Sequence, residues 1–166
     1  MKLLEWAKGA KSILEIGSRF GYTLVDLAHG MEGNGTVVAV DWPEIGDWGS
    51  VGSEEVLKTN AKQLKKEGYD VYLFMGDSKN PEIIQWVRDK GPYDFIFIDG
   101  DHRYDGVKAD WLVYGPMGKR TVFHDIREPT AGENKNLQVW KLWNEIEGHE
   151  SFIAHDSKMG IGRYDR

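Results

Sequence analysis

The chain has 166 residues and contains no cysteine. This absence excludes a disulfide framework, a thiolate zinc site, an iron–sulfur cluster and a cysteine nucleophile. Any metal ion must therefore be held by oxygen or imidazole ligands. The length corresponds to one domain, because domains commonly have roughly 100–200 residues.

The sequence also lacks an excess of positive charge and any long apolar run. The 21 Lys and Arg residues face 27 Asp and Glu residues, which gives a formal net charge of -6, whereas a nucleic-acid-binding domain normally has a basic footprint. No apolar run approaches the ~20 residues that span a bilayer. The first residues, MKLLEWAKGAK, include Glu5 and no apolar region typical of a secretory signal. We therefore expect a soluble, cytoplasmic protein with no nucleic-acid or membrane partner.

Short apolar runs alternate with helical patterns along the chain. The runs are 13–16, 37–40, 71–75, 95–98 and 121–123. Continuous apolar runs are typical of strands buried on both faces of a parallel sheet. Apolar residues at helical spacing predict helices within 24–31, 56–64, 81–87, 107–111 and 139–146. Residues 152–154 and 161–164 predict a closing antiparallel hairpin. The order predicts βαβ units and a parallel sheet, which is an α/β fold.

Each of the five predicted parallel strands ends at, or within two residues of, an acidic side chain. These acids are Glu15, Asp41, Asp77, Asp99 and Asp125, and His102 and His124 accompany the last two. The carboxyl ends of parallel strands share one edge of the sheet, where ligands bind in open α/β folds. Acids also cap helices, and we expect this role for Asp101. Five acids at one edge nevertheless favour a binding site over capping alone.

The loop after the first strand, residues 15–21, is rich in glycine but matches neither GxGxxG nor a phosphate loop. Glu15 is a poor neighbour for a pyrophosphate and suits a positively charged ligand. Asp41 lies at the end of the next strand, where an acid binds ribose hydroxyls. Together these residues predict a nucleoside that carries a cationic substituent and no phosphate.

Three motifs, ILEIGSRFGYT, the acid Asp41 and GDS (76–78), resemble those of class I S-adenosylmethionine-dependent methyltransferases. The resemblance spans nearly the whole chain and implies that residues 1–166 form a single S-adenosylmethionine-dependent methyltransferase domain. It implies a Rossmann-like, seven-stranded, mostly parallel sheet with helices on both faces and a C-terminal antiparallel hairpin. The implied cofactor-binding residues are Glu15, Gly17, Ser18, Arg19, Gly21, Asp41, Trp42, Asp77, Ser78 and Asp99. For Arg19 an alternative is to cover the sheet edge, and for Trp42 a place in the core.

FIDGDHRYDGVKAD (97–110) and VFHDI (122–126) resemble metal-dependent O-methyltransferases of the cephalosporin-hydroxylase and macrolide-sugar methyltransferase group. The resemblance implies that Asp99 and Asp125 bind Mg²⁺ or another divalent cation and that His102 is the general base. His124 departs from the usual pattern of the group, and it is either a third metal ligand or a structural histidine that holds Asp125. The implied acceptor is a hydroxyl of a sugar or another small polar molecule.

The chemistry of such a reaction agrees with these residue types. Methyl transfer from a sulfonium to a hydroxyl requires donor and acceptor about 3 Å apart. A hard dication on carboxylates lowers the pKa of the hydroxyl, and a histidine removes its proton. Two alternatives remain, a nicotinamide-dependent oxidoreductase and a non-catalytic S-adenosylmethionine-binding protein. A homo-oligomer is left open, and residues 42–52 and 127–136 are candidates for covering the acceptor.

Overall fold

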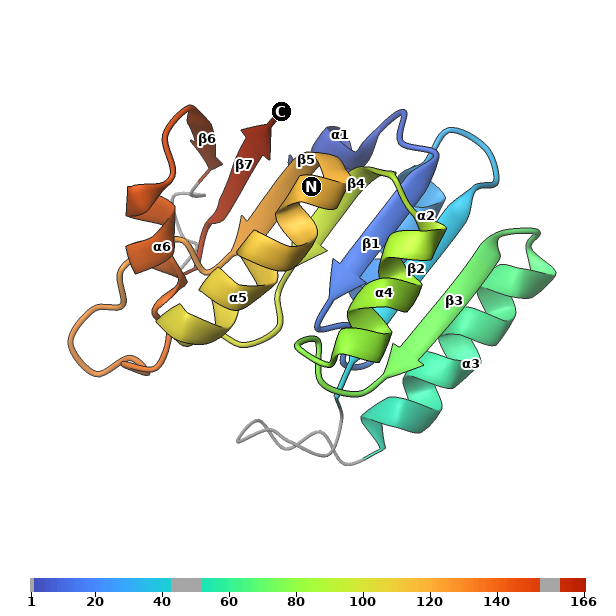
Figure 1. Ribbon diagram of the computed structural model, residues 1–166, viewed down its shortest axis with the longest axis horizontal. Helices are drawn as coiled ribbons and strands as arrows, with labels where there is room; N and C mark the ends of the chain where they lie inside the picture. The colour runs from blue at the N-terminus through green and yellow to red at the C-terminus, as the bar shows by residue number, and fades with distance from the viewer. Residues whose placement is uncertain (1, 43–51, 153–158) are drawn as a thin grey trace.

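The computed structural model describes residues 2–42, 52–152 and 159–166 of the chain. One sheet of seven strands runs through it in the order β3-β2-β1-β4-β5-β7-β6 (Figure 1). The strands are β1 (Ser12–Ile16), β2 (Thr36–Asp41), β3 (Asp70–Met75), β4 (Tyr93–Ile98), β5 (Gly118–His124), β6 (His149–Phe152) and β7 (Ile161–Asp165). β1 to β5 pair in parallel, and β7 pairs antiparallel with both β5 and β6. The Rossmann-like sheet and its closing hairpin are therefore confirmed.

Helices cover both faces of the sheet (Figure 1). They are α1 (Lys2–Ala7), α2 (Tyr22–Gly30), α3 (Ser53–Lys66), α4 (Pro81–Lys90), α5 (Tyr104–Tyr114), the 3₁₀ turn η1 (Gly115–Met117) and α6 (Val139–Glu145). Buried side chains of α1, α2 and α3 pack on one face, and those of α4, α5 and α6 pack on the other. Consecutive residues Ile13 and Leu14 of β1 belong to opposite cores. Both faces of the strand are covered, which explains why its sequence is continuously apolar.

Two elements differ from the sequence-based prediction. The helix α1 has only six residues, too few for a periodic pattern, and such short helices depend on packing rather than propensity. Leu3 and Trp6 supply that packing. The first strand of the hairpin is β6 at His149–Phe152 rather than 152–154, and residues 153–158 lie outside the described part. This strand forms one edge of the sheet, where polar side chains can face solvent.

Other local predictions agree with the structure. Pro81 is the first residue of α4, and the side chain of Asn80 accepts the Glu82 backbone N–H at 2.9 Å. The helix α3 contains the predicted range 56–64 and starts earlier, at Ser53, with Gly52 as its N-cap. Among the described residues, no helix is long and apolar enough to cross a membrane.

Candidate active site

The predicted site residues gather where the strand order reverses, between β1 and β4. Ligands in open α/β sheets bind at this point, beyond the carboxyl ends of the strands. The Gly17 N–H donates to the Val40 carbonyl at 2.8 Å, and the Asp99 N–H donates to the Ile16 carbonyl at 2.9 Å. These bonds extend the sheet into the loops and fix the strand ends relative to one another.

Gly17 has no room for a side chain. Its φ is +88°, and a Cβ at this position would lie 2.4 Å from the backbone oxygen of Asp99. Gly21 also has a positive φ, of +74°, and a Cβ there would meet Leu57 at 2.6 Å. The positive φ favours glycine at both positions, and at Gly17 the backbone of Asp99 also excludes any side chain.

Glu15 is a buried carboxyl beneath this loop. Its side chain is 1% exposed, and Oε2 has no hydrogen-bond partner among the described residues. Burial raises the pKa of Glu15 to about 8; the nearby Ser18 opposes the shift, and the charges of Asp99 and Asp41 add to it. A buried acid with an unpaired oxygen favours a positively charged partner, as the sequence predicted.

Asp41 ends β2 and is oriented by the glycine loop. Its Oδ1 accepts the Arg19 backbone N–H at 3.0 Å, and Arg19 has a left-handed backbone with φ 50°. Burial raises the pKa of Asp41, although the backbone N–H groups of Arg19 and Ser18 oppose this shift. Trp42 follows and is 41% exposed. It is therefore not a core residue, and its ring is available for a ligand.

The loop after β3 is held by contacts within the protein. Asp77 Oδ1 accepts the Lys79 backbone N–H at 2.9 Å, and the Ser78 hydroxyl donates to Asp110 Oδ1 at 2.6 Å. Tyr114 donates its hydroxyl to the Ser78 carbonyl at 2.5 Å. The Ser78 side chain thus anchors the loop that carries the GDS motif (76–78) to α5. Its direct contact with a ligand stays a prediction.

Asp110 was missed by the sequence analysis. It is 2% exposed on α5, and burial raises its pKa to about 6, against the effect of the Ser78 hydrogen bond. One feature of the sequence could have pointed to Asp110: it lies three residues after Val107, on the apolar face of the predicted helix. Asp110 links α5 to the loop that carries Asp77 and Ser78.

Two acids and two histidines meet beyond β4 and β5. His102 Nδ1 lies 2.9 Å from Asp125 Oδ2, and His124 Nδ1 lies 3.1 Å from Asp99 Oδ1 and 3.3 Å from Asp125 Oδ1. Asp125 follows β5 directly, with a left-handed backbone at φ 59° and 3% exposure. The predicted base and the predicted metal ligands therefore form one cluster.

Electrostatics in this cluster couple the four groups. Burial would raise the pKa of Asp125, but its contacts with His102 and His124 hold that pKa well below its ordinary value. Burial also disfavours charged histidines, yet contacts with Asp125 and Asp99 raise the pKa of His124 to about 10. The pKa of His102 rises for the same reasons. The carboxylates therefore require positive charge, which protonated imidazoles or a divalent cation can supply.

The cluster fits a metal ion. Asp99, His102 and Asp125 each offer one ligand atom, and these atoms lie within 4.8 Å of one another. Asp125 Oδ1 is buried, and it lies 3.3 Å from His124 Nδ1 without a well-aligned hydrogen bond. The structure thus groups His102 with the two acids, whereas His124 contacts both acids but falls outside this group.

Asp101 lies outside the group formed by Asp99, His102 and Asp125 and has a structural role. It accepts the Arg103 backbone N–H at 3.0 Å, and its carboxylate pairs with the Arg103 guanidinium at 2.7 Å. A Cβ at Gly106 would lie 2.2 Å from Asp101 Cγ, so the carboxyl packs on the first turn of α5. Arg103 is the N-cap residue; Asp101 supports the helix start from two residues earlier.

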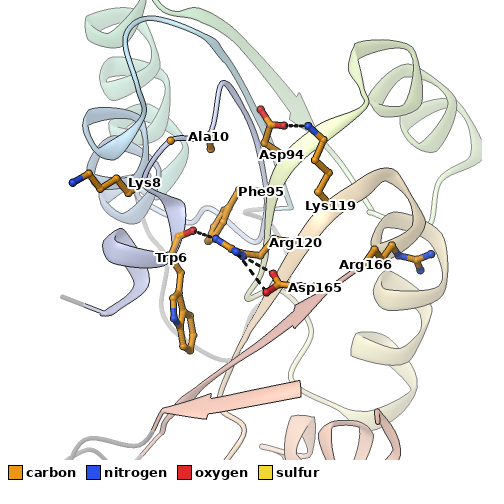
Figure 2. A pocket seen from close by; sticks show the side chains of 10 residues that line it. Trp6, Lys8, Ala10, Asp94, Phe95, Lys119, Arg120, Asp165 and Arg166 are labelled. Carbon is orange, nitrogen blue, oxygen red and sulfur yellow. Dashed lines mark hydrogen bonds and ion pairs between the residues drawn. The ribbon is translucent and has the colours of Figure 1, made fainter. Parts of the chain in front are cut away.

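A concave region lies at the opposite, amino-terminal edge of the sheet. It is a cavity of about 380 Å³ near Trp6 and Ala10 (Figure 2). Lys119 pairs with Asp94 at 2.7 Å, and Arg120 pairs with Asp165 and donates to the Trp6 carbonyl, both at 2.6 Å. These pairs fasten α1 and β7 to the starts of β4 and β5, and none of the predicted site residues lies there.

Comparison with known proteins identifies the class. A methyltransferase domain family matches residues 14–126, well over half of the chain, and the chain belongs to this family. The predicted membership in the class I S-adenosylmethionine-dependent methyltransferases is therefore confirmed, and the nicotinamide-dependent alternative is set aside. No curated protein matches the chain.

Solved structures share the fold at low identity. An O-methyltransferase from Bacillus cereus in complex with SAH has a TM-score of 0.70 and 18% identity, over 99% of this chain and 77% of that chain. An O-methyltransferase from Streptomyces achromogenes involved in tomaymycin synthesis, in complex with SAM, has a TM-score of 0.66 and 16% identity, over 97% of this chain and 75% of that chain. A precorrin-6y C5,15-methyltransferase from Geobacter metallireducens has a TM-score of 0.65 and 13% identity, over 99% of this chain and 86% of that chain. These similarities concern the fold.

Proposed function

We propose that this methyltransferase transfers the methyl group of S-adenosylmethionine to a hydroxyl of a sugar or another small polar molecule, with the help of a divalent cation. The observation that carries the proposal is the cluster of Asp99, His102 and Asp125 beside the buried Glu15. Two structural neighbours, O-methyltransferases in complex with SAH and with SAM, support the same chemistry.

The donor site is built from the glycine loop and the first two strand ends. S-adenosylmethionine supplies a methyl group on a positively charged sulfur. The Asp41 carboxylate, which the Arg19 N–H orients, accepts hydrogen bonds from the ribose hydroxyls. Glu15 offers a buried carboxyl to the positive charge of the donor. Gly17 lets the donor loop pack directly against the backbone of Asp99 at the end of β4.

Asp99 and Asp125 are the residues that would hold the cation, which supports ionisation of the acceptor hydroxyl. Both are oxygen ligands, which suit Mg²⁺. His124 lies within 3.3 Å of both carboxylates and is a candidate for a third ligand.

His102 is the proposed general base. Asp125 holds Nδ1 at 2.9 Å, which fixes the tautomer so that the ring accepts a proton at Nε2. The hydrogen bond to Asp125 and the charges of Asp99 and Asp125 raise the pKa of His102; a cation on the two carboxylates would offset this effect and favour an imidazole that is free to accept a proton. His102 is also one of the three residues that could ligate a metal, and the two roles exclude each other.

The test is His102→Ala, assayed by release of S-adenosylhomocysteine with a panel of sugars and catechol as acceptors. Loss of a general base lowers the rate by about 10²–10⁴-fold. We expect unchanged S-adenosylhomocysteine affinity, measured by tryptophan fluorescence quenching, and unchanged Mg²⁺ affinity, measured by calorimetry. His29→Ala is the matched control, because His29 pairs with Glu67 on the surface.

Three results would contradict parts of the proposal. Full methyl transfer by His102→Ala would exclude the base role. Loss of Mg²⁺ affinity in the same variant would make His102 a ligand instead. Donor binding by the wild-type protein without turnover of any acceptor would favour the non-catalytic alternative.

A further inference from the structure

We infer that Gln138 is a positioning residue for His102, brought to the reaction centre by the loop 127–137. The inference rests on the proposed role of His102. Gln138 is the N-cap residue of α6, far from the motifs that define the site, and the sequence analysis gave it no role.

Gln138 contacts the chain on both sides of Arg103. Its backbone N–H donates to the His102 carbonyl at 2.7 Å, and its side-chain Oε1 accepts the Tyr104 backbone N–H at 3.2 Å. Gln138 thus holds the His102 carbonyl and the first N–H of α5 at the same time. His102 lies in the segment 99–103, which has neither helix nor strand of its own, so its backbone position depends on such external contacts.

The loop 127–137 has an internal structure that delivers Gln138 to this place. Arg127 pairs with Glu133 at 2.9 Å, and both side chains are about four-fifths buried (21% and 22% exposed). Glu133 also accepts the Thr130 backbone N–H at 2.6 Å. Asp125 lies two residues before this loop, and Gln138 follows it directly. Both residues contact His102: the Asp125 carboxylate contacts its side chain, and the Gln138 N–H contacts its backbone carbonyl.

The far end of α6 reinforces the same contact. The Tyr104 hydroxyl donates to Glu145 at 2.7 Å, and Lys108 reaches both Glu145, at 3.2 Å, and the Tyr104 hydroxyl. The first turn of α5 is therefore tied to α6 at both ends of α6. His102 directly precedes this turn, so the packing of α6 determines where the imidazole lies relative to Asp99 and Asp125.

This arrangement matters because proton transfer depends on geometry within about 1 Å. Residues that orient a reacting group without touching the substrate commonly change activity by about 10–100-fold when replaced. We expect the Gln138 side chain to contribute at the lower end of this range, because its backbone N–H remains in every variant.

The test compares two variants of similar length. Gln138→Met removes the side-chain acceptor, whereas Gln138→Glu keeps an oxygen that can accept the Tyr104 N–H. Hydrogen exchange of the Tyr104 amide, followed by NMR, should accelerate about tenfold in Gln138→Met and stay near the wild-type rate in Gln138→Glu. Gln85→Met on the exposed face of α4 is the control. Unchanged Tyr104 exchange in Gln138→Met would overturn the inference without any activity assay.

Kinetics separate this inference from the proposed function. With the acceptor that the wild type methylates fastest, Gln138→Met should lower kcat about tenfold, leave the KM for S-adenosylmethionine within about twofold, and leave Tm unchanged. Gln138→Glu should recover most of kcat. An unchanged kcat in Gln138→Met, together with an inactive His102→Ala, would refute the role of Gln138 alone. An active His102→Ala would refute the proposed function itself.

Discussion

The imidazole of His102 and the carboxylate of Asp125 form a pair, with Nδ1 2.9 Å from Oδ2. His102 follows β4 and Asp125 follows β5, neighbouring parallel strands of the sheet. A carboxylate on one ring nitrogen fixes the tautomer and leaves the other nitrogen as the site of proton transfer. The pair therefore joins the two predicted halves of the reaction centre, the base and the metal site.

Asp125→Asn removes the charge of this pair while preserving its shape. We expect methyl transfer to fall by at least about 100-fold, because the variant weakens both the metal site and the basicity of His102. The rate of S-adenosylhomocysteine release and calorimetric titration with Mg²⁺ measure the two effects. Asp70→Asn, at the exposed start of β3, should change neither. Retained Mg²⁺ affinity would show that Asp125 is not a ligand.

Removal of divalent cations tests the metal-dependent branch. EDTA should abolish methyl transfer, and Mg²⁺ added in excess should restore it, because carboxylate sites bind hard cations reversibly. Quenching of tryptophan fluorescence by S-adenosylhomocysteine should persist in EDTA, since Glu15 and Asp41 belong to the donor side. Undiminished turnover in EDTA would remove the metal from the mechanism and leave the acids as charge partners of the histidines.

Glu15 predicts an unusual pH dependence of stability. Its pKa is raised from 4.5 to about 8 on folding, so its contribution to stability is fully present below pH 4.5 and is lost as the pH rises through 8. Over this window the loss is about 1.4 kcal/mol per pH unit. Glu15→Gln has no proton to lose. We expect the free energy of unfolding of Glu15→Gln, measured with urea on the ligand-free proteins, to rise relative to that of the wild type from pH 5 to pH 8. A difference between the two free energies that stays constant over this range would mean that Glu15 titrates normally.

The same substitution should weaken donor binding. A neutral amide cannot balance the positive charge of S-adenosylmethionine, and a hydrogen bond to a charged group contributes about 1.5–3 kcal/mol. We therefore expect Kd for the donor to rise by at least tenfold, as measured by calorimetry at pH 8. Glu67→Gln, on the surface beside His29, should leave Kd unchanged. Wild-type affinity in Glu15→Gln would place the positive charge of the donor elsewhere.

Gly17 and Gly9 offer a matched comparison of steric effects. Their φ values are +88° and +85°, but a Cβ at Gly17 would lie 2.4 Å from Asp99 backbone whereas a Cβ at Gly9 meets nothing within 4 Å. Gly9→Ala should therefore lower the free energy of unfolding by only about 1–2 kcal/mol, because alanine disfavours the left-handed backbone conformation. Gly17→Ala should cost clearly more and also impair donor binding. Thermal unfolding of the two variants measures the difference; equal losses would show that the strand end of β4 moves aside.

Local sequence patterns were sufficient to predict most of the fold. Continuous apolar runs identify β1 to β5; β1, β2 and β4 are buried on both faces, whereas β3 is a half-buried edge strand. The same logic failed for β6, whose polar residues lie at the sheet edge, and for α1, which has too few residues to show a period. In both elements the stabilising contacts come from other parts of the chain, such as the stacking of His149 on Trp143.

The sequence by itself determined which chemistry stands at each strand end: a buried acid at Glu15, an acid after β2, and the acids and histidines after β4 and β5. Parallel strands align their carboxyl ends, so topology alone brings these residues to one edge. Only the tertiary structure decided that Asp125 pairs with His102, that Asp110 anchors Ser78, and that Gln138 reaches the His102 backbone. These contacts depend on side-chain directions and on how the loop 127–137 folds back. Helix and strand periodicity carries no information about either, because it reports only which face of an element is buried.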